Sequence, residues 1–333
     1  MTEFDLIARF FNRPLAAGAT VARGIGDDCA LLDFGGTTQL AVTCDMLIAG
    51  RHFFPDAAPA DIGHKALAVN LSDLAAAGAE PRCFFLALGL PDADEAWLGD
   101  FSAGMFAVAD EFACVLAGGD TTRMPIGTSS DGPLTICITA VGEVPRGAAL
   151  TRAGARPGDD IWVSGHLGDA ALALDAHAGR VELDADEFSA VCLRLERPTP
   201  RVNLGIGLRG LATACIDVSD GLIGDLGHIL ARSKTGATVE WAVVPRGRAL
   251  ARQARGTQLR CALAGGDDYE LAFAASPGRR AAVEAAAKAA RTPVTRVGAI
   301  TEGRDLTIHD EGGKPIDTPF KAYDHFGSYD PTP

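Results

Sequence analysis

The first half of the chain alternates apolar and polar segments in a pattern that predicts an α/β domain. Residues 61–81 carry small and apolar side chains at helical spacing, with Asp61 suited to the N-cap and Gly78 to the position after the C-cap. The runs TTQLAVTCDMLIAG and CFFLALGLP on either side of it have the length and composition of strands. A second helix is expected from about residue 94 to 112, followed by the strands CVLAGG and PLTICITAVGEV.

The second half repeats this alternation after a break. Residues 146–160, RGAALTRAGARPGDD, are rich in glycine, arginine and proline, so we expect an N-terminal domain over 1–148 and a C-terminal domain over 149–333. Strands are predicted at IWVSG, ATACIDVS, ATVEWAVV, YELAFAA and PVTRVGAI. Helices are predicted from Gly168 and near 186–195, 203–211, 221–232 and 278–290. The expected fold class is therefore α/β, with mixed sheets in two domains.

Composition supports two globular domains. The 333 residues exceed the size at which a single core usually keeps growing, and 47% of them are hydrophobic against 22% charged. No apolar run is long enough to span a bilayer, and an acid stands near the start where a signal peptide would be basic, so we expect a cytoplasmic protein without a membrane partner. The 8 cysteines are scattered without a C-x-x-C pair, which favours reduced core residues over zinc ligands.

The charge balance restricts the possible ligands. With 43 acidic and 30 basic residues the formal net charge is −13, which argues against nonspecific nucleic-acid binding because that needs a basic surface. A phosphorylated ligand would have to be bridged to this chain by cations.

Acidic residues recur where apolar strands are expected to end. The stretches GIGDDCA, AVTCD, LAGGDTT and IDVSDG each join an apolar run to a turn of glycine and aspartate. Asp73 adds a fifth acidic element on an otherwise apolar helix end, on the same face as Asn70, where we expect something to compensate its charge. The carboxylates of the four stretches are Asp27, Asp28, Asp45, Asp120, Asp217 and Asp220.

Two interpretations of these acids compete. Any one aspartate can serve a turn or a helix cap, whereas the whole set, with few basic neighbours, favours Mg²⁺ bound together with a phosphorylated substrate. The chain has no G-x-x-x-x-G-K-[ST] motif and no G-x-S-x-G elbow, and its G-x-G-x-x-G match, GIGLRG, does not follow a strand. His52 is the histidine nearest to the acidic set in sequence, with a substrate contact and a structural loop role equally open.

Seven segments in order resemble one family. They are GIGDDCAL, KALAVNLSDLAAAGAEP, GGDTTR, LTRAGARPGDDIWVSG, IDVSDGLIGDLGHI, GGDDYEL and YDHF, and the resemblance extends from about Phe4 to Phe326. Together they are similar to thiamine-monophosphate kinases, a branch of the superfamily that includes aminoimidazole ribonucleotide synthetase and selenophosphate synthetase. GGDDYEL and YDHF favour the thiamine branch.

The resemblance implies a two-domain aminoimidazole ribonucleotide synthetase-like fold, a homodimer formed through strands of the first domain, and transfer of phosphate from ATP to thiamine monophosphate. Carried over by motif, the implied catalytic residues are Asp45, Asp120, Arg152 and Asp217. The implied Mg²⁺ ligands are Asp28, Thr43, Cys44, Asp45, Asp73, Asp120, Asp217 and Asp220. The implied ATP contacts are Gly119, Asp120, Arg152 and Ser219, and the implied thiamine contacts are His52, Asp267 and Phe320.

The sequence departs from the family pattern at three of these positions. Cys44 stands where threonine is frequent, and because a thiol is a poor Mg²⁺ ligand, coordination there would pass to a backbone carbonyl or to water. Asp267 replaces a frequent glutamate, and Phe320 stands where a tryptophan can stack on the substrate. An aromatic face with a nearby carboxylate is a suitable receptor for the thiazolium cation. The insertion MPIGTSSDGP, residues 124–133, also lengthens the loop after GGDTT.

The implied chemistry is direct in-line phosphoryl transfer. The acceptor is a phosphate that is already largely ionised at pH 7, so the reaction needs alignment and charge neutralisation more than a general base. Selenophosphate synthetase is a rival within the superfamily, but it needs a reactive cysteine near the N-terminus and Cys29 lies in an apolar run. A metal-dependent phosphatase and a non-catalytic nucleotide or Ca²⁺ sensor are the alternatives from other classes, and ATP turnover distinguishes them from a kinase.

Overall fold

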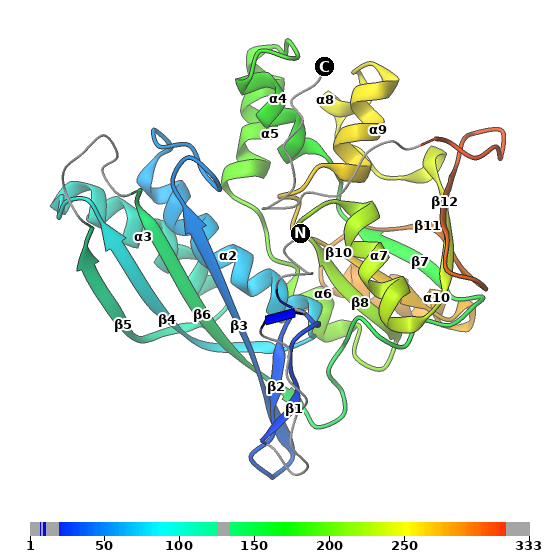
Figure 1. Ribbon diagram of the computed structural model, residues 1–333, viewed down its shortest axis with the longest axis horizontal. Coiled ribbons are helices and arrows are strands. Elements are labelled where there is room, and N and C mark those ends of the chain that lie inside the picture. Colours follow the sequence, from blue (N-terminus) through cyan, green and yellow to red (C-terminus); the bar gives the residue numbers. More distant parts are fainter. Residues whose placement is uncertain (1–6, 8, 11–19, 125–132, 318–333) are drawn as a thin grey trace.

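The chain forms two six-stranded sheets, one from each half, and the long helix α2 (Pro59–Ala76) contacts strands of both. Figure 1 shows the first sheet on the left and the second on the right of this helix. This computed structural model describes residues 7, 9–10, 20–124 and 133–317. Most of the predicted loop insertion and the terminal YDHF motif lie outside the described residues.

The first sheet has the strand order β1-β2-β3-β6-β4-β5. All neighbouring strands are antiparallel except β4 and β5, which are parallel and are joined by helix α3 (Glu95–Glu111). Since β6 lies between β3 and β4, the sheet order differs from the chain order. The bounds are β1 Val21–Arg23, β2 Ala30–Leu32, β3 Thr38–Ile48, β4 Glu80–Leu90, β5 Val115–Arg123 and β6 Thr135–Pro145.

Helix α2 begins earlier than the sequence indicates. Its first residue is Pro59 and its N-cap is Ala58, so the predicted N-cap at Asp61 is wrong by three residues. Proline at the first helical position fits because its fixed φ is helical and its missing N–H would have no partner there. At the other end Gly78 follows the C-cap with φ +64°, as predicted.

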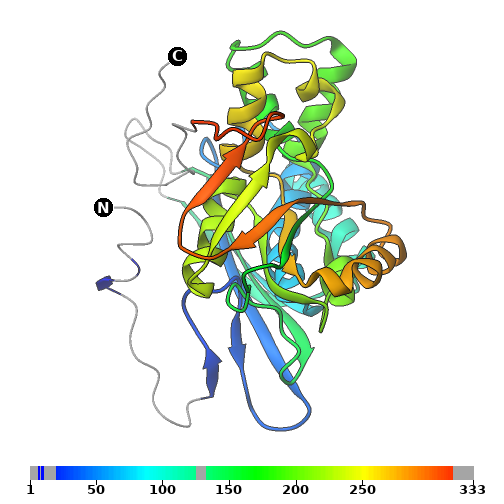
Figure 2. The same cartoon turned by 90° about the vertical axis from the view of Figure 1, so that its right-hand side faces the viewer.

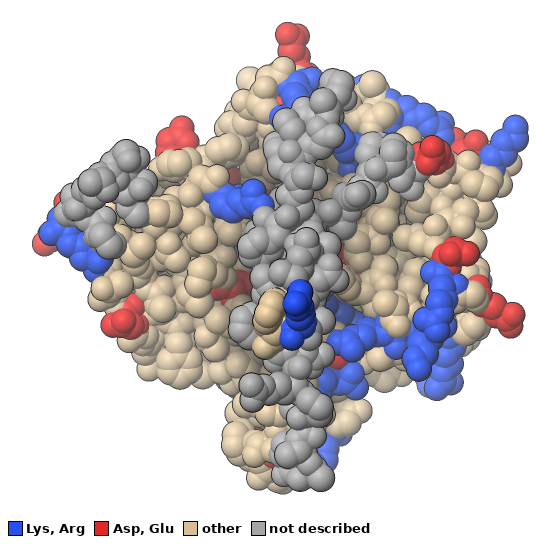
Figure 3. All heavy atoms as spheres, viewed as in Figure 1, with Lys and Arg blue, Asp and Glu red and all other residues tan. Residues whose placement is uncertain are grey.

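Within the described part of the chain, helices cover one face of the first sheet. Figure 2 shows α2 and α3 on one side of the strands. Apolar side chains remain exposed on the other face, including Met46 (54% exposed), Phe85 (44%) and Val115 (65%). The surface over β3 and β6 carries few charged side chains (Figure 3). An apolar sheet face of this kind is typical of a surface that another molecule covers.

The second sheet has the order β12-β9-β11-β7-β10-β8, with only β9 and β12 parallel. Its strands are β7 Asp160–Ser164, β8 Ala212–Val218, β9 Gly236–Glu240, β10 Glu270–Ala275, β11 Val294–Thr301 and β12 Leu306–His309. The helices of this half are α4 Asp169–His177, α5 Ala185–Glu196, α6 Val202–Gly207, α7 Leu222–Ser233, α8 Arg248–Ala251, α9 Arg255–Ala264 and α10 Arg280–Ala289. The short elements β1, β12, α8 and α9 were not predicted, whereas the predicted helices and strands are confirmed with shifted ends.

The buried apolar residues form two clusters, and one of them runs through both halves. It joins Phe84 and Leu74 of the first half to Phe273 and Leu271 of β10. The other cluster fills the opposite face of the second sheet, beneath α4, α7 and α9. The shared core holds α2 firmly against both sheets, so side chains from the two halves can meet at fixed distances. Among the described residues no helix is long and apolar enough to cross a membrane.

Candidate active site

Three carboxylates from distant parts of the sequence meet where the two halves join. Asp28 comes from the loop between β1 and β2, Asp73 from the last turn of α2, and Asp217 from β8. One oxygen of each lies within 4.8 Å of the oxygens of the other two. The Asp28 side chain is only 2% exposed, and Asp217 is 4% exposed. We refer to these three residues as the acidic cluster.

Among the described residues, each carboxylate of the acidic cluster contacts a polar side chain. The Arg152 guanidinium contacts Asp28 at 2.7 Å, and the Ser72 hydroxyl donates to Asp217 at 2.7 Å. The Thr43 hydroxyl donates to Asp73, but a hydroxyl does not cancel the charge, so the predicted compensation of Asp73 stays a prediction. Of these three contacts, the one with Arg152 supplies positive charge.

Burial and mutual repulsion raise the pKa values of carboxylates in the acidic cluster. Burial raises the pKa of Asp217 to about 8, and the charge of Asp28 adds to that rise. Burial, with repulsion from Asp45 and Asp217, holds the pKa of Asp73 well above its usual range. Burial also raises the pKa of Asp45 to about 6. Without bound positive charge the cluster therefore retains protons, and a divalent cation is the natural replacement for them.

The adjacent acids Asp27 and Asp28 have different surroundings. The Asp27 carboxylate accepts the backbone N–H of Arg152 at 2.7 Å and pairs with Arg23 at 2.8 Å. Asp27 therefore anchors the segment around Arg152, whereas Asp28 belongs to the acidic cluster.

Two predicted site acids lie within strands and not at strand ends. β3 continues past Asp45 to Ile48, and β5 continues past Asp120 to Arg123, because both pair with long neighbouring strands. Asp45 lies beside the acidic cluster, where its backbone N–H donates to Asn70 at 3.2 Å. Asp120 is exposed on the edge strand β5. It lies in register with Met46 of β3, but three strand spacings, or about 14 Å, separate the two residues. One copy of the chain does not bring Asp120 to the cluster.

Two other predicted ligands of β3 and β5 are explained by strand geometry. Thr43 and Asp45 point toward α2, so Cys44 points to the uncovered face, where its sulfur lies 3.4 Å from that of Cys137. Its thiol is therefore directed away from the acidic cluster, and only the backbone of Cys44 remains as a ligand. At Gly119 a Cβ would lie 1.8 Å from the carbonyl oxygen of Leu86, so this strand position requires glycine.

The turn between β8 and α7 holds the predicted residues Ser219 and Asp220. Their two backbone N–H groups both donate to Asp225, at 3.1 Å each. Asp225 is 3% exposed and lies in the first turn of α7, so its buried carboxylate fixes the backbone of the loop between β8 and α7. The Ser219 carbonyl in turn accepts the N–H of Asp267 at 2.9 Å, which joins this turn to the GGDDYE segment.

A cleft lies along the same helix α2 that carries Asp73 and contains two of the predicted substrate residues. Its space of about 550 Å³ includes a part that is open to solvent. His52 and Asp267 line it together with the apolar side chains of Phe53, Phe54 and Ile62. The third predicted substrate residue, Phe320, lies outside the described residues.

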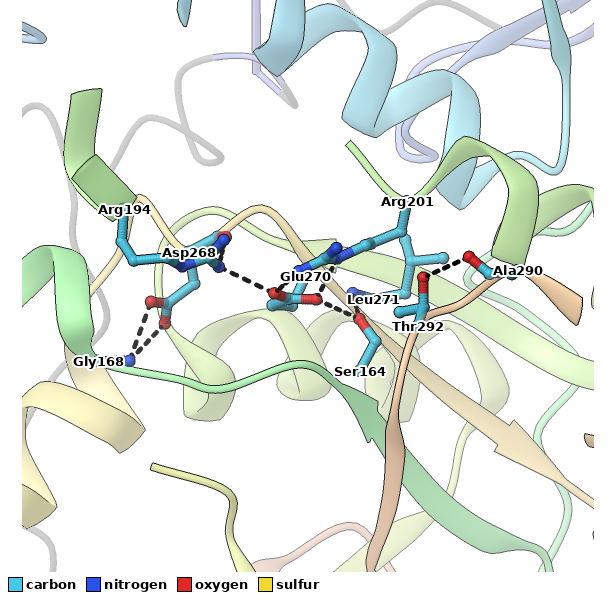
Figure 4. Close-up of polar contacts among 9 residues, drawn as sticks. All are labelled: Ser164, Gly168, Arg194, Arg201, Asp268, Glu270, Leu271, Ala290 and Thr292. Carbon is cyan, nitrogen blue, oxygen red and sulfur yellow. Dashed lines mark hydrogen bonds and ion pairs between the residues drawn. The ribbon is translucent and has the colours of Figure 1, made fainter. Parts of the chain in front are cut away.

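The GGDDYE segment has a backbone that side chains hold in place. Asp267 (φ +65°) and Tyr269 (φ +51°) both adopt left-handed conformations, which cost about 1–3 kcal/mol each for residues other than glycine. Between and after them, Asp268 and Glu270 are buried anchors (Figure 4). Asp268 accepts the Gly168 N–H at 2.9 Å.

Glu270 is the most heavily paired acid of this segment. It is fully buried and contacts Arg194 at 2.8 Å, Arg201 through Nε at 2.6 Å and the Ser164 hydroxyl at 2.6 Å. Figure 4 shows these groups converging on its carboxylate from three directions. The anchors alternate along the chain with Asp267 and Tyr269, which are thereby presented to the cleft and the cluster.

Several contributors to the site were not predicted. Ser72 and Asp225 bind predicted site residues, and the Tyr269 hydroxyl donates to Asp267 at 3.1 Å. Lys65, on α2, pairs with Asp267 at 3.0 Å. Only Lys65 gives a clear signal in the sequence, because a single lysine within an apolar helix is rarely buried without a partner.

Comparisons with known proteins agree with this architecture. The family models for the N-terminal and C-terminal domains of AIR synthase related proteins match residues 26–144 and 156–311. A thiamine-monophosphate kinase of Escherichia coli strain K12 is 45% identical over 328 residues, covering 98% of each chain. A crystal structure of thiamine-monophosphate kinase from Stenotrophomonas maltophilia K279a is 45% identical with a TM-score of 0.77, covering 94% of this chain and 96% of that one. A structure of AaThiL complexed with AMPPCP and TMP has 28% identity and a TM-score of 0.81, covering 98% and 97%.

The two matched domains and the acidic cluster between them define a protein of the AIR synthase related class. Within this class, the 45% sequence identity to the Escherichia coli thiamine-monophosphate kinase over 98% of the chain shows the family. The chain belongs to the thiamine-monophosphate kinase family.

Proposed function

We propose that the chain transfers the γ-phosphate of ATP to thiamine monophosphate and releases thiamine diphosphate and ADP. The observation that supports this function is that one helix, α2, contributes residues to both the cleft and the acidic cluster. Lys65 lines the cleft, and Ser72 and Asp73, about 11 Å further along the same helix, contact or belong to the cluster. The organic part of the acceptor would occupy the cleft while its phosphate points toward the cluster.

We propose that Mg²⁺ binds at Asp28, Asp73 and Asp217, with Asp45 and Asp220 as neighbouring ligands. Three converging carboxylates with raised pKa values and one guanidinium fit a hard divalent cation, which prefers oxygen ligands. Bound Mg²⁺ would neutralise charge on the phosphates and align them for transfer. A chain with net charge −13 would otherwise repel both substrates.

The protein side chains would then act mainly by positioning. A guanidinium has five N–H donors, and Arg152 uses Nε and Nη2 toward Asp28, so it can also donate to a phosphate of ATP. The turn at Ser219, fixed by Asp225, offers further polar groups on the same side. Because the acceptor phosphate is already ionised, we infer direct in-line attack without a protein general base or a phosphoenzyme.

The cleft suits a cationic heteroaromatic ring. Phe53 and Phe54 supply apolar and aromatic surface, and Asp267 supplies negative charge at the cleft wall. Phe320, predicted from the family motif, would add a stacking partner. His52, whose Nδ1 accepts the Ile48 N–H at 3.0 Å, lines the same cleft, and we propose it as a further contact of the acceptor.

We also propose that the chain acts as a homodimer through the uncovered face of the first sheet. Support comes from Met46, Phe85 and Val115, which are exposed on that sheet. A predicted role for Asp120 in metal and ATP binding would then be fulfilled across the dimer interface, since about 14 Å separates it from the strand that carries Asp45 in one copy. We place the reaction in the cytoplasm, where ATP is available to a biosynthetic kinase.

The test is product analysis with purified protein, ATP, Mg²⁺ and thiamine monophosphate. We expect thiamine diphosphate and ADP in equal amounts, and loss of both in Asp45→Asn. Thiamine in place of its monophosphate serves as the control acceptor. Release of inorganic phosphate from monophosphates without ATP consumption would instead establish a phosphatase and refute the kinase.

A further inference from the structure

Lys65 is a buried cation between the two halves of the molecule. It lies in the second turn of α2, and its side chain is only 3% exposed. Burying a lysine is costly unless its charge is paired and its donors are used. Two contacts meet this requirement, one with each half of the chain.

The first contact is to the loop that follows β3. The Lys65 ammonium donates to the His52 carbonyl oxygen at 3.0 Å. Phe53 and Phe54 follow directly in this loop and form part of the cleft wall. The contact therefore fixes the backbone that carries the aromatic side of the cleft.

The second contact is to the GGDDYE segment of the C-terminal half. The same ammonium lies 3.0 Å from Oδ1 of Asp267, whose side chain is 27% exposed. The Tyr269 hydroxyl reaches the same oxygen at 3.1 Å. Lys65 thus holds the Asp267 side chain. The residues that follow Asp267 are anchored through the contacts of Asp268 with Gly168 and of Glu270 with Ser164 (Figure 4).

We propose that Lys65 is a positioning residue for the acceptor, because its two contacts tie the acidic wall of the cleft to the backbone of the aromatic wall. This inference rests on the proposed function. Its physical basis is preorganisation, since a carboxylate and a loop that are already ordered lose less entropy when the ligand binds. Lys65 also keeps the Asp267 carboxylate paired while the cleft is empty.

The test is the steady-state kinetics of Lys65→Met, which keeps the apolar stem and removes both contacts. We expect KM for thiamine monophosphate to rise about tenfold, corresponding to about 1.4 kcal/mol, with kcat and the KM for ATP changed less than about twofold. Lys65→Gln, which retains a donor for the His52 carbonyl, is expected to lie between Lys65→Met and the wild-type chain. Lys288→Met, at an exposed lysine of α10, is the matched control and should match the wild-type chain.

A double-mutant cycle with Asp267→Asn tests whether the two residues act together. Because they form one pair, the double variant should raise KM no more than the stronger single variant. An unchanged KM for thiamine monophosphate in Lys65→Met, additive effects in the cycle, or equal rises in both KM values would overturn the inference while leaving the kinase in place. Loss of folding in both Lys65 variants would make the residue purely structural and would equally overturn it. A wild-type chain that forms no thiamine diphosphate would overturn the proposed function and the inference together.

Discussion

Replacing Asp217 by asparagine should stabilise the metal-free protein while removing its activity. Asparagine keeps the size of the side chain and an acceptor for the Ser72 hydroxyl, but it carries no charge. Burial raises the pKa of Asp217 from 3.8 to about 8, so a folded chain that holds no metal resists ionisation of this group. Stability linked to the raised pKa is fully present below pH 4 and is lost as pH rises toward 8.

The magnitude follows from the pKa difference. About four pKa units at 1.36 kcal/mol each give an upper limit of about 5 kcal/mol at pH 8. Asp28 and Asp73 share this repulsion and relax when one acid is removed, so we expect about 2–3 kcal/mol. For 333 residues that unfold together, an entropy of about 2.1 cal/mol/K per residue converts this into a rise in Tm of about 4 °C.

The assay is thermal unfolding in EDTA at pH 5 and at pH 8, followed by the same melts in Mg²⁺. The advantage of Asp217→Asn over the wild-type chain should grow from pH 5 to pH 8 in EDTA, and Mg²⁺ should stabilise the wild-type chain more than the variant. The control is Asp175→Asn, because Asp175 is equally buried but paired with Arg180 at 2.8 Å, and its loss should be destabilising. An Asp217→Asn variant that is less stable than the wild-type chain in EDTA at pH 8 would refute the repulsion argument.

Four further predictions address other parts of the molecule. Glu270→Gln should lower the free energy of unfolding in urea by about 3–5 kcal/mol, because two arginines lose their charge partner, whereas Glu284→Gln on an exposed helix face should have little effect. Removal of Mg²⁺ by EDTA should abolish thiamine diphosphate formation, and its return at 100 times Kd should add about 2.7 kcal/mol of stability, measured by Tm. Phe85→Asp should convert a dimer into monomers in light scattering, whereas Val243→Asp, on the second half, should not. Phe320→Ala should raise KM for thiamine monophosphate much more than KM for ATP, and equal rises would contradict its assignment.

The sequence predicted the residue types of the site better than their arrangement. Asp28, Asp73 and Asp217 could be selected because acids beside apolar runs are costly unless a ligand compensates them. Asp120 shows the same local pattern, yet one chain leaves it at the edge of the sheet. The difference arises because both β6 and β4 lie between β3 and the edge strand β5, and strand order depends on long-range pairing that local periodicity does not encode.

Backbone conformation was the second limit on prediction. Asp267 was placed at the substrate site from its motif, but its left-handed φ could not be predicted because only a small minority of residues other than glycine adopt it. Lys65 contacts the Asp267 side chain. Glu270, which anchors the same segment, contacts Arg201 and Ser164, and these residues lie 69 and 106 positions away from it in the sequence. Such contacts become visible only once the two halves are folded together.

Helix α2 has a consequence for changing the acceptor that this protein uses. Its second turn faces the cleft through Ile62 and Lys65, and its last two turns face the cluster through Ser72 and Asp73. The two sets of residues lie at different turns of one helix, so substitutions in the early turns are expected to reshape the pocket without moving the groups for which we propose metal and phosphate binding. The scaffold is therefore suited to redesign for other phosphomonoesters, provided that the register of α2 against β3 is preserved through Asn70 and Thr43.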